Sequence, residues 1–418
     1  MPENQSVLDK AIINILRKTE ITERSIDFLY YPILKKEISL LDCELFSLND
    51  SEQNRVYDIY TQSQVFMDEG KITEAIELLT SVQTFVKEPL ASNYYNLGCA
   101  YYRIDQFNNA EKAFKKSIEI APDLKDAHHS LAHIYLKSNR LEESLTELQR
   151  INKEWPVFEN ILFDLGTAYV LSQDYKNGVK YLWKELRNDP YNGLAYNNLG
   201  FTYNELGMFK ESIECLEKVI NMSSNFGKPY LNLAMSFLKS GNPDAAIMYL
   251  KNLIFIHSTN RWAHFALGLV YKMQGRFFEA VESYLNAIKI NYNFAEAHLH
   301  LSLCYLDKGI ANNNNELLDD ALHEISMFIS LRLGDGRGYL IKGILYQKKQ
   351  KNAEALRSYE RAIKCFSNIN STSADYLHAF ILQSEILLSE NNHEQLQKVI
   401  DKAIKVFPLD PYLKQLKA

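Results

Sequence analysis

The sequence predicts an all-α fold in which antiparallel helix pairs stack into a solenoid. Three observations lead to this prediction. Six consecutive blocks of 34 residues run from residue 91 to residue 294 without insertion or deletion. Apolar residues recur within each block at the three-and-four spacing of an amphipathic helix. Small residues recur at two fixed positions of every block, and one helix pair alone cannot bury both of its apolar faces, whereas a stack of pairs can.

The six blocks share a pattern of small and large residues. They begin at Ala91, Lys125, Glu159, Gly193, Gly227 and Arg261. Position 8 is small, in Gly98, Ala132, Gly166, Gly200, Ala234 and Gly268. Position 11 is aromatic, in Tyr101, Tyr135, Tyr169, Tyr203, Phe237 and Tyr271. Position 20 is small again, in Ala110, Ser144, Gly178, Ser212, Ala246 and Ala280. Position 24 is large, in Phe114, Leu148, Leu182, Leu216, Leu250 and Tyr284. We expect the small residues to let two helices approach closely and the large ones to fill the space around them.

Each block is expected to hold two helices. In the first regular block the spacing predicts helices over 93–104 and 108–120. Position 32 is proline in three blocks, at Pro122, Pro156 and Pro190. Proline removes a backbone donor and clashes with the preceding turn, so these residues are expected to end the second helix.

Less regular blocks flank the six. A weaker repeat covers 56–89, an eighth covers 295–335, a ninth covers 336–369 and a tenth covers 377–410. The eighth carries seven extra residues around 310–317, which we expect to form an exposed turn because they include the run 312–315 of asparagines. The prediction is therefore a solenoid of about ten repeats over 56–410, with a short capping helix at 411–418.

Residues 1–55 do not fit the repeat. Two helical stretches are expected, at 7–18 and 22–46, and they are too apolar to be left in water. Two interpretations stay open: the segment caps the first repeat, or it folds back into the groove of the solenoid as an internal ligand.

Composition narrows the function classes. The net charge of −6 gives no basic stripe for nucleic acid. A run of about 18 apolar residues, which a membrane-spanning helix needs, is missing from the sequence. The five cysteines are odd in number and form no Cys-x-x-Cys pair, which favours a reducing compartment. We expect a cytoplasmic protein.

The 34-residue pattern resembles the tetratricopeptide family of helix–turn–helix repeats. The resemblance implies that the solenoid is a right-handed superhelix. It also implies a scaffold for binding proteins, in which the first helix of each pair lines a concave groove. Positions 2, 5, 6, 9, 12 and 13 would then face a ligand.

Position 6 supplies the candidate polar half of this groove. It holds Asn96, Asp164, Asn198 and Asn232. Asparagine at this place resembles the ladder in the repeat region of O-linked N-acetylglucosamine transferases, which implies binding of an extended peptide backbone. One amide offers both a donor and an acceptor for one peptide unit. The catalytic domain of those transferases is absent, so no transferase activity is implied. Alternatively, the asparagines are ordinary polar residues of the surface.

An apolar strip supplies the other half. Its candidate residues are Phe163, Phe201, Met235, Trp262, Phe265, Leu269, Leu299 and Leu303. Such a strip suits an amphipathic helix laid into a groove. The alternative is that these side chains pack between neighbouring repeats.

No catalytic motif is recognised, and neither an enzymatic activity nor a cofactor is predicted. His129 and His133 are four residues apart on one helical face, but the sequence shows no third ligand near them. No metal site is predicted.

The sequence therefore predicts a scaffold that binds a protein or peptide partner, without nucleic acid and without a direct membrane span, and with self-association possible. Two alternatives remain. One is an assembly chaperone or adaptor for a larger machine, membrane-associated machines included. The other is an accessory subunit that presents substrates to a separate enzyme.

Overall fold

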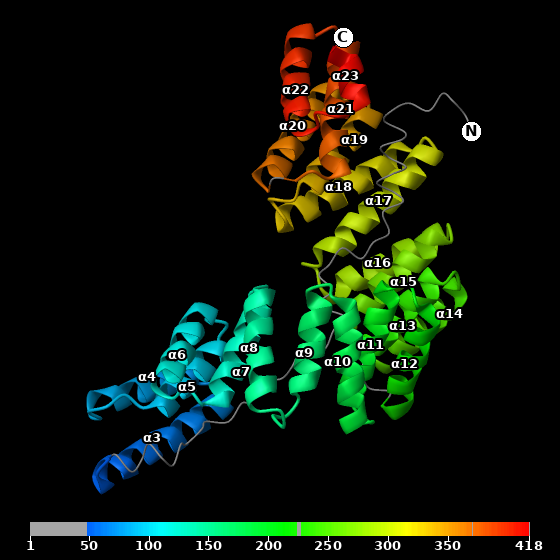
Figure 1. Ribbon diagram of the computed structural model, residues 1–418. Helices are drawn as coiled ribbons and strands as arrows, with labels where there is room; N and C mark the ends of the chain where they lie inside the picture. The colour runs from blue at the N-terminus through cyan, green and yellow to red at the C-terminus, as the bar shows by residue number, and fades with distance from the viewer. Residues whose placement is uncertain (1–47, 224–226, 370, 418) are drawn as a thin grey trace. The chain divides into compact units, whose positions relative to one another are not determined.

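The computed structural model describes residues 48–223, 227–369 and 371–417. Within these residues the regular structure consists of 21 α-helices and one short 3₁₀ helix, with no strand. The helices follow one another in ten pairs and a terminal helix, and the members of a pair lie side by side (Figure 1). The protein is an all-α solenoid. The helices expected at 7–18 and 22–46, and with them the choice between a cap and an internal ligand, lie outside the described residues.

The first helices of the ten pairs are α3 (Asp50–Asp68), α5 (Ala91–Arg103), α7 (Lys125–Lys137), α9 (Ile161–Leu171), α11 (Gly193–Glu205), α13 (Gly227–Lys239), α15 (Arg261–Met273), α17 (Ala295–Ala311), α19 (Gly336–Lys348) and α21 (Ala374–Ser389). Their partners are α4 (Ile72–Ser81), α6 (Phe107–Ile120), α8 (Leu141–Glu154), α10 (Tyr175–Asn188), α12 (Phe209–Met222), α14 (Pro243–Ile256), α16 (Phe277–Ile290), α18 (Asn315–Leu331), α20 (Asn352–Asn368) and α22 (His393–Val406). A short 3₁₀ turn, η2 (Val82–Thr84), follows α4, and α23 (Pro411–Lys417) ends the chain where a short helix was predicted.

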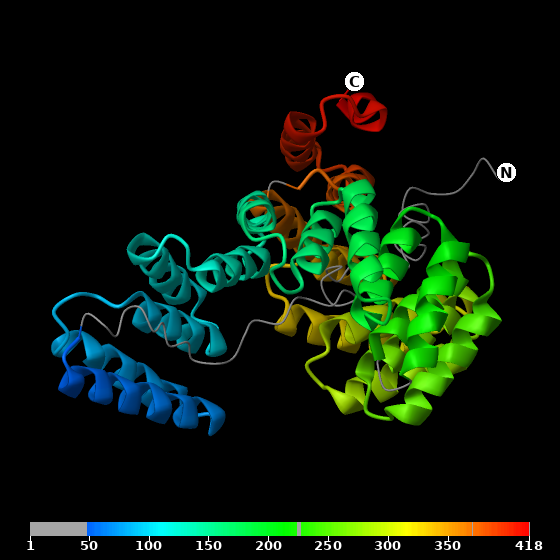
Figure 2. The same cartoon turned by 60° about the horizontal axis from the view of Figure 1, so that its bottom comes forward.

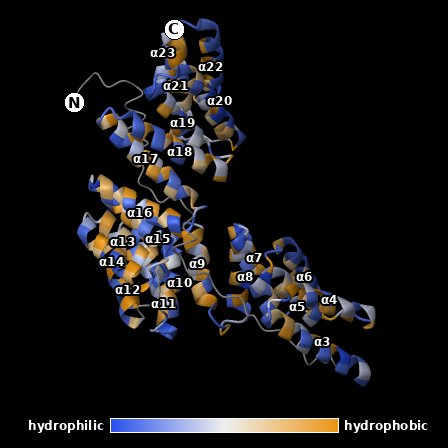
Figure 3. Ribbon diagram, turned by 180° about the vertical axis from the view of Figure 1, so that it is seen from behind, coloured by the Kyte–Doolittle hydropathy of each residue, from blue (hydrophilic) through white to orange (hydrophobic). Residues whose placement is uncertain are grey.

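The chain divides into two compact units, with the boundary between Ser236 and Phe237 in α13. The described part of the N-terminal unit covers 48–236, and the C-terminal unit covers 237–417. In each unit, consecutive helix pairs stack in chain order (Figure 2). Hydrophobic and hydrophilic residues alternate around the helices, as expected for elements with one buried face (Figure 3).

The turn inside each pair is closed by a residue with positive φ, which stands at position 15 except in the lengthened eighth repeat, where it is Asn313. In the first regular block this residue is Asp105, with φ of 57°. The next N–H, of Gln106, donates to the carbonyl of Tyr101 at 3.0 Å. The same closure joins Arg140 to Tyr135 at 2.8 Å. This is the six-to-one hydrogen bond of a Schellman motif, which satisfies a carbonyl that the end of a helix leaves without a partner. The sequence pattern did not reveal it, because Asp, Asn, Gln and Gly all occur at position 15.

The second helices end at one position whether or not proline follows. Helices α6, α8 and α10 end two residues before a proline, as predicted. Helices α12, α14 and α16 end at the same block position without one. The residue after each helix leaves the helical region in both groups, as in Ala121 (φ −128°, ψ 89°) and Asn291 (φ −141°, ψ 101°). Proline is therefore compatible with the junction and is not what produces it.

The close approach of paired helices is confirmed at position 8. A Cβ added to Gly98 would lie 2.5 Å from a ring carbon of Phe114, and one added to Gly268 would lie 2.7 Å from the ring of Tyr284. Both rings are fully buried. Where position 8 is alanine, in Ala132 and Ala234, position 24 is leucine and not aromatic. Leucine also occurs opposite glycine, in Leu182 with Gly166 and Leu216 with Gly200, so only the larger aromatic ring coincides strictly with glycine at position 8.

The prediction that the seven extra residues of the eighth repeat form an exposed turn is wrong. Helix α17 is 17 residues long against 13 in α15, and α18 is 17 against 14 in α16. The two helices therefore absorb all seven residues, and the turn between them is only 312–314. Leu318 is 5% exposed and packs against Gly309, so the added turns bury apolar surface. Local helix propensity and this burial outweigh the turn tendency of the asparagine run.

We expect Gly268→Ala to destabilise the protein by about 1–3 kcal/mol, because the added methyl group overpacks against the ring of Tyr284. Adding Tyr284→Leu should restore most of the loss, since Ala132 with Leu148 already forms this combination elsewhere in the chain. Gly193→Ala is the matched control: its Cβ would meet only Val219 at 3.6 Å, an ordinary contact. Thermal melts of the four proteins check this, and a neutral G268A would contradict it.

Candidate protein-binding surface

The four candidate polar residues lie on first helices of the N-terminal unit and are buried. Asn96, Asp164 and Asn198 have no exposed surface, and Asn232 is 2% exposed. They come from α5, α9, α11 and α13 in turn. Position 6 thus points toward the body of the protein, because neighbouring first helices stack closely at this height.

A row of side-chain hydrogen bonds connects three successive first helices. The Asn232 amide donates to Asn197 Oδ1 at 3.0 Å, and the Asn197 amide donates to Asn198 Oδ1 at 3.2 Å. The Asn198 amide donates in turn to Thr167 Oγ1 at 3.0 Å. These bonds run from α13 through α11 to α9. A contact between the asparagines and a bound peptide stays a prediction.

Sequence reasoning missed Thr167 and Asn197 as members of this row. They occupy positions 9 and 5 of their blocks, and each contacts a residue at position 6 of the next block. The signal was present in the sequence, since polar residues at positions 5 and 9 precede asparagine at position 6 of the next block in both cases. The 34-residue register alone does not say which positions of neighbouring blocks touch.

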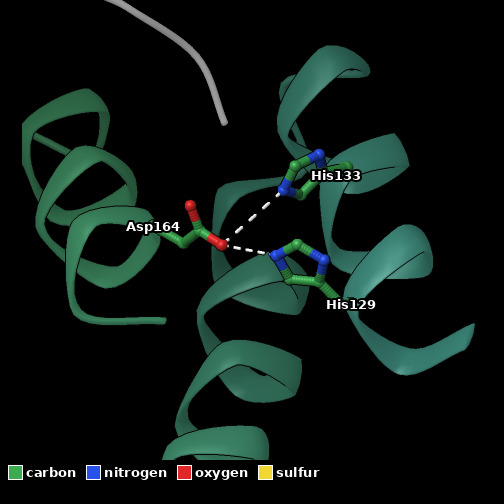
Figure 4. A group of neighbouring side chains, drawn as sticks. All are labelled: His129, His133 and Asp164. Atoms are coloured by element: carbon green, nitrogen blue, oxygen red, sulfur yellow. Dashed lines mark hydrogen bonds and ion pairs between the residues drawn. The ribbon is translucent and has the colours of Figure 1, made fainter. Parts of the chain in front are cut away.

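Asp164 takes part in a different group, with His129 and His133 (Figure 4). The histidines lie one turn apart on α7 and the carboxylate lies on α9. His129 Nε2 forms an ion pair with Asp164 Oδ2, and His133 Nε2 lies 3.8 Å from the same oxygen. The imidazole centroids are 4.4 Å apart. The expectation that no third ligand lies near the histidines is wrong, because the fold brings it from the next repeat.

Burial and charge shift the acid–base behaviour of this group. Burial by itself would raise the pKa of the Asp164 carboxyl, but the charge and hydrogen bond of His129, together with the nearby His133 imidazole, outweigh it, and the pKa lies below its ordinary value. The pKa of the His133 imidazole is lowered, first by burial and then by the charge of His129. The group therefore holds a carboxylate and at least one neutral imidazole near neutral pH.

Most of the candidate apolar residues are buried as well. Six of the eight are at most 8% exposed: Phe163, Phe201, Phe265, Leu269, Leu299 and Leu303. Met235 and Trp262 are half-buried. A role of these eight residues in binding a partner stays a prediction, and only Met235 and Trp262 offer surface for it in the structure.

Phe265 was expected to point into the groove and not toward the next repeat, and this expectation is wrong. Its ring is 2% exposed. It lies 5.2 Å from the ring of His300 in the next repeat, 5.2 Å from that of Phe294 at the end of its own block, and 5.8 Å from that of Tyr284. The ring fills the space between α15 and α17, where a smaller residue would leave a cavity.

The ring of Trp262 packs against the rings of Phe294 and Phe265. Its ring meets Phe294 edge-on at 4.7 Å and Phe265 at 6.1 Å. The Arg261 guanidinium lies 5.6 Å from the Trp262 and Phe294 ring centres, within the range of cation–π attraction. A half-buried tryptophan held by two rings and a cation is a rigid apolar surface with a positive charge beside it.

Stacked helix pairs with first helices joined by polar and aromatic rows define a repeat scaffold. Three segments match the family model of the tetratricopeptide repeat, at residues 91–124, 194–226 and 262–294. These segments begin within one residue of blocks found from the sequence. The chain belongs to the tetratricopeptide repeat family, and its general role is that of a protein-interaction scaffold.

Curated relatives share the repeat region at low identity. The BBSome complex member BBS4 of Bos taurus is 23% identical over 77% of this chain and 61% of its own length. Anaphase-promoting complex subunit 3 of Schizosaccharomyces pombe is 19% identical over 70% of this chain and 43% of its own length. The chain thus spans less than two thirds of either relative. A solved tetratricopeptide repeat protein from Parabacteroides merdae is 17% identical, with a TM-score of 0.53 over 60% of this chain and 99% of its own. This last likeness concerns the fold.

Among the described residues, no helix combines the length and the apolar character that crossing a bilayer requires.

One buried histidine makes stability depend on pH. His300 on α17 is 4% exposed, and its Nδ1 has no hydrogen-bond partner. Its pKa lies well below the ordinary value because burial disfavours the charged ring and Lys272 and Arg337 repel it. Nearby His298 shows the opposite shift: burial lowers its pKa, but hydrogen bonds to Glu324 and to the carbonyl of Tyr292 outweigh this and raise it.

We expect acid to destabilise the protein through His300. Its neutral form is favoured in the fold, so its contribution is complete above the unfolded pKa of about 6.5 and is lost as pH falls toward the lower folded pKa. Between about pH 7 and pH 5 this amounts to at most about 1.4 kcal/mol per pH unit. His300→Gln should flatten the fall in melting temperature. His298→Gln should steepen it, because the raised pKa of His298 stabilises the fold in acid. Equal slopes in all three proteins would contradict this assignment.

Proposed function

We propose that the chain binds an amphipathic helix of a protein partner through the first-helix surface around Trp262. Three features of this surface support the proposal: Trp262 is half-buried, its ring packs against Phe294, and Arg261 lies beside it. Tryptophan and arginine are the residues most enriched among those that dominate binding energy. The partner helix would place an apolar residue against the Trp262 ring and an acidic residue near Arg261.

Rigidity is the property that favours Trp262 over other exposed apolar residues. Fixing a flexible side chain on binding costs about 0.5–1.5 kcal/mol. Trp262 is already fixed by Phe294 and Phe265, so little of this cost remains. Phe265 contributes by supporting Trp262 and not by contact with the partner, because its own ring is enclosed.

A second candidate function is that of an adaptor within a larger assembly, and a separate surface favours it. Large apolar residues are exposed on two second helices of the C-terminal unit. They are Met248 (50% exposed) and Phe255 (90%) on α14, and Phe278 (77%) and Leu285 (45%) on α16. Each pair is seven residues apart, so its members share one side of their helix. The named relatives are members of multiprotein complexes, which agrees with such a role.

Affinity capture with matched variants tests the first proposal. The full-length chain, Trp262→Ala and Trp183→Ala are used to capture proteins from the native cell extract, and bound chains are quantified by mass spectrometry. Trp183 is the control, because it is 40% exposed but lies on a second helix, α10. We expect Trp262→Ala to reduce capture of one partner by about 30-fold, the equivalent of about 2 kcal/mol for a dominant contact. Trp183→Ala should leave that partner bound.

Stability is measured on the same variants to separate binding from folding. Trp262→Ala should melt within a few degrees of the unchanged protein, because the ring is only half-buried. Equal capture by the unchanged chain and Trp262→Ala, with both folded, would refute binding at this surface.

A double variant tests the exposed apolar residues of α14 and α16 as an adaptor surface. Phe255→Ser combined with Phe278→Ser should leave the melting temperature nearly unchanged, because both rings are largely exposed. Loss of several co-captured chains together, with the Trp262-dependent partner retained, would support a second interface. An unchanged set of captured chains would contradict it.

A further inference from the structure

The geometry points to a binding site for one divalent transition-metal ion, such as Zn²⁺, formed by His129, His133 and Asp164. The site lies wholly in the N-terminal unit and joins the first helices of two consecutive repeats, α7 and α9. It is separate from the surface around Trp262 and does not depend on the proposed function.

The donor set selects the class of ion. Each residue offers one ligand atom, and the three atoms lie within 4.8 Å of one another. Imidazole nitrogen is a good ligand for Zn²⁺ and related ions, whereas Mg²⁺ and Ca²⁺ prefer oxygen throughout. Two histidines one helical turn apart, joined by a carboxylate, form a three-ligand set that leaves a position for water.

The distances require only a small adjustment. In a tetrahedral site with bonds of about 2.0–2.2 Å, ligand atoms are about 3.3–3.5 Å apart. His133 Nε2 and Asp164 Oδ2 are 3.8 Å apart, close to this value. His129 Nε2 is in direct ion-pair contact with Asp164 Oδ2, so an ion would separate that pair by roughly 1 Å. Rotation of the imidazole and carboxylate side chains is enough for this.

Two buried atoms at the site lack hydrogen-bond partners, and a bound ion would improve the surroundings of both. His133 Nε2 and Asp164 Oδ1 are buried and make no hydrogen bond. Leaving such groups unpaired costs about 1–3 kcal/mol each, and more when they are charged. An ion would take the Nε2 lone pair of His133 and balance the charge of the Asp164 carboxylate. The ordinary alternative is a His129–Asp164 ion pair alone, which satisfies neither atom.

An apolar ring covers one side of the candidate metal site, and another side is accessible to solvent. The ring of Phe158 packs edge-on against His129 at 4.9 Å and covers one side of the site with apolar surface. The side chain of His129 keeps 11% of its surface exposed, while Asp164 has none. Solvent therefore reaches the site from the His129 side. A bound ion would link α7 to α9 directly and stiffen the junction between two repeats.

Zinc binding to the full-length protein tests the site. The protein is stripped of metal, checked for folding by circular dichroism and titrated with ZnCl₂ in a calorimeter. We expect one equivalent to bind, the melting temperature to rise with zinc, and hydrogen exchange to slow in α7 and α9 but not in the C-terminal unit. Asp164→Asn and His133→Gln should each weaken binding by more than about 100-fold, because losing a ligand costs more than losing an outer partner of one.

The matched control is His298→Gln. His298 also forms a buried ion pair with a carboxylate, Glu324 at 2.6 Å, but belongs to no group of three possible ligands among the described residues. Its loss should leave zinc affinity unchanged. Equal zinc affinity in the unchanged chain and in folded Asp164→Asn would overturn the proposal, as would an unchanged chain that binds no zinc.

X-ray absorption spectroscopy of the zinc-loaded unchanged protein keeps the test independent of variants that fail to fold. Two imidazole rings and at least one oxygen ligand in the zinc coordination sphere are expected. Fewer than two imidazoles would mean that zinc binds elsewhere, and the proposal would be wrong.

Discussion

Every repeat of this protein depends on the close approach of its two helices at position 8. The residue there is small, and a large side chain from the second helix packs against it, as Phe114 does at Gly98 and Leu182 at Gly166. In the six regular blocks an aromatic ring at position 24 occurs only opposite glycine, whereas leucine occurs opposite glycine or alanine. Because interiors are close-packed, the larger ring needs the space that glycine leaves. The sequences of the repeats can therefore differ at both positions while paired helices stay in close contact.

A second constraint acts between repeats. The hydrogen bonds of Thr167 to Asn198 and of Asn197 to Asn232 join position 9 or 5 of one block to position 6 of the next. The ion pair of His129 with Asp164 uses the same two positions. So does the contact of Phe265 with His300 in the C-terminal unit. Position 6 therefore contacts the preceding block in each case, and the contact is an amide hydrogen bond, an ion pair or a ring contact depending on the repeat.

This relation explains why residues assigned to an open groove are enclosed. Position 6 was expected to face a ligand because it lies on the first helix, yet its side chains meet those of the preceding repeat. Buried polar groups need partners, and a row of such groups on stacked helices supplies them to one another. Trp262 is at position 2, which takes no part in these contacts between blocks, and its side chain stays half-buried. The same relation brings Asp164 to the two histidines, which are 35 and 31 residues away in sequence.

The sequence by itself determined the repeat length, the helix pairs and their order, because periodic small and apolar residues carry that information locally. It also located the glycines and large side chains at which paired helices touch. Only the tertiary structure decided that the seven extra residues lengthen two helices and that the ring of Phe265 is buried. Only the tertiary structure brings His129, His133 and Asp164 together. Each of these depends on which faces of successive repeats come together, and that arrangement arises from packing many side chains at once and not from any single stretch of chain.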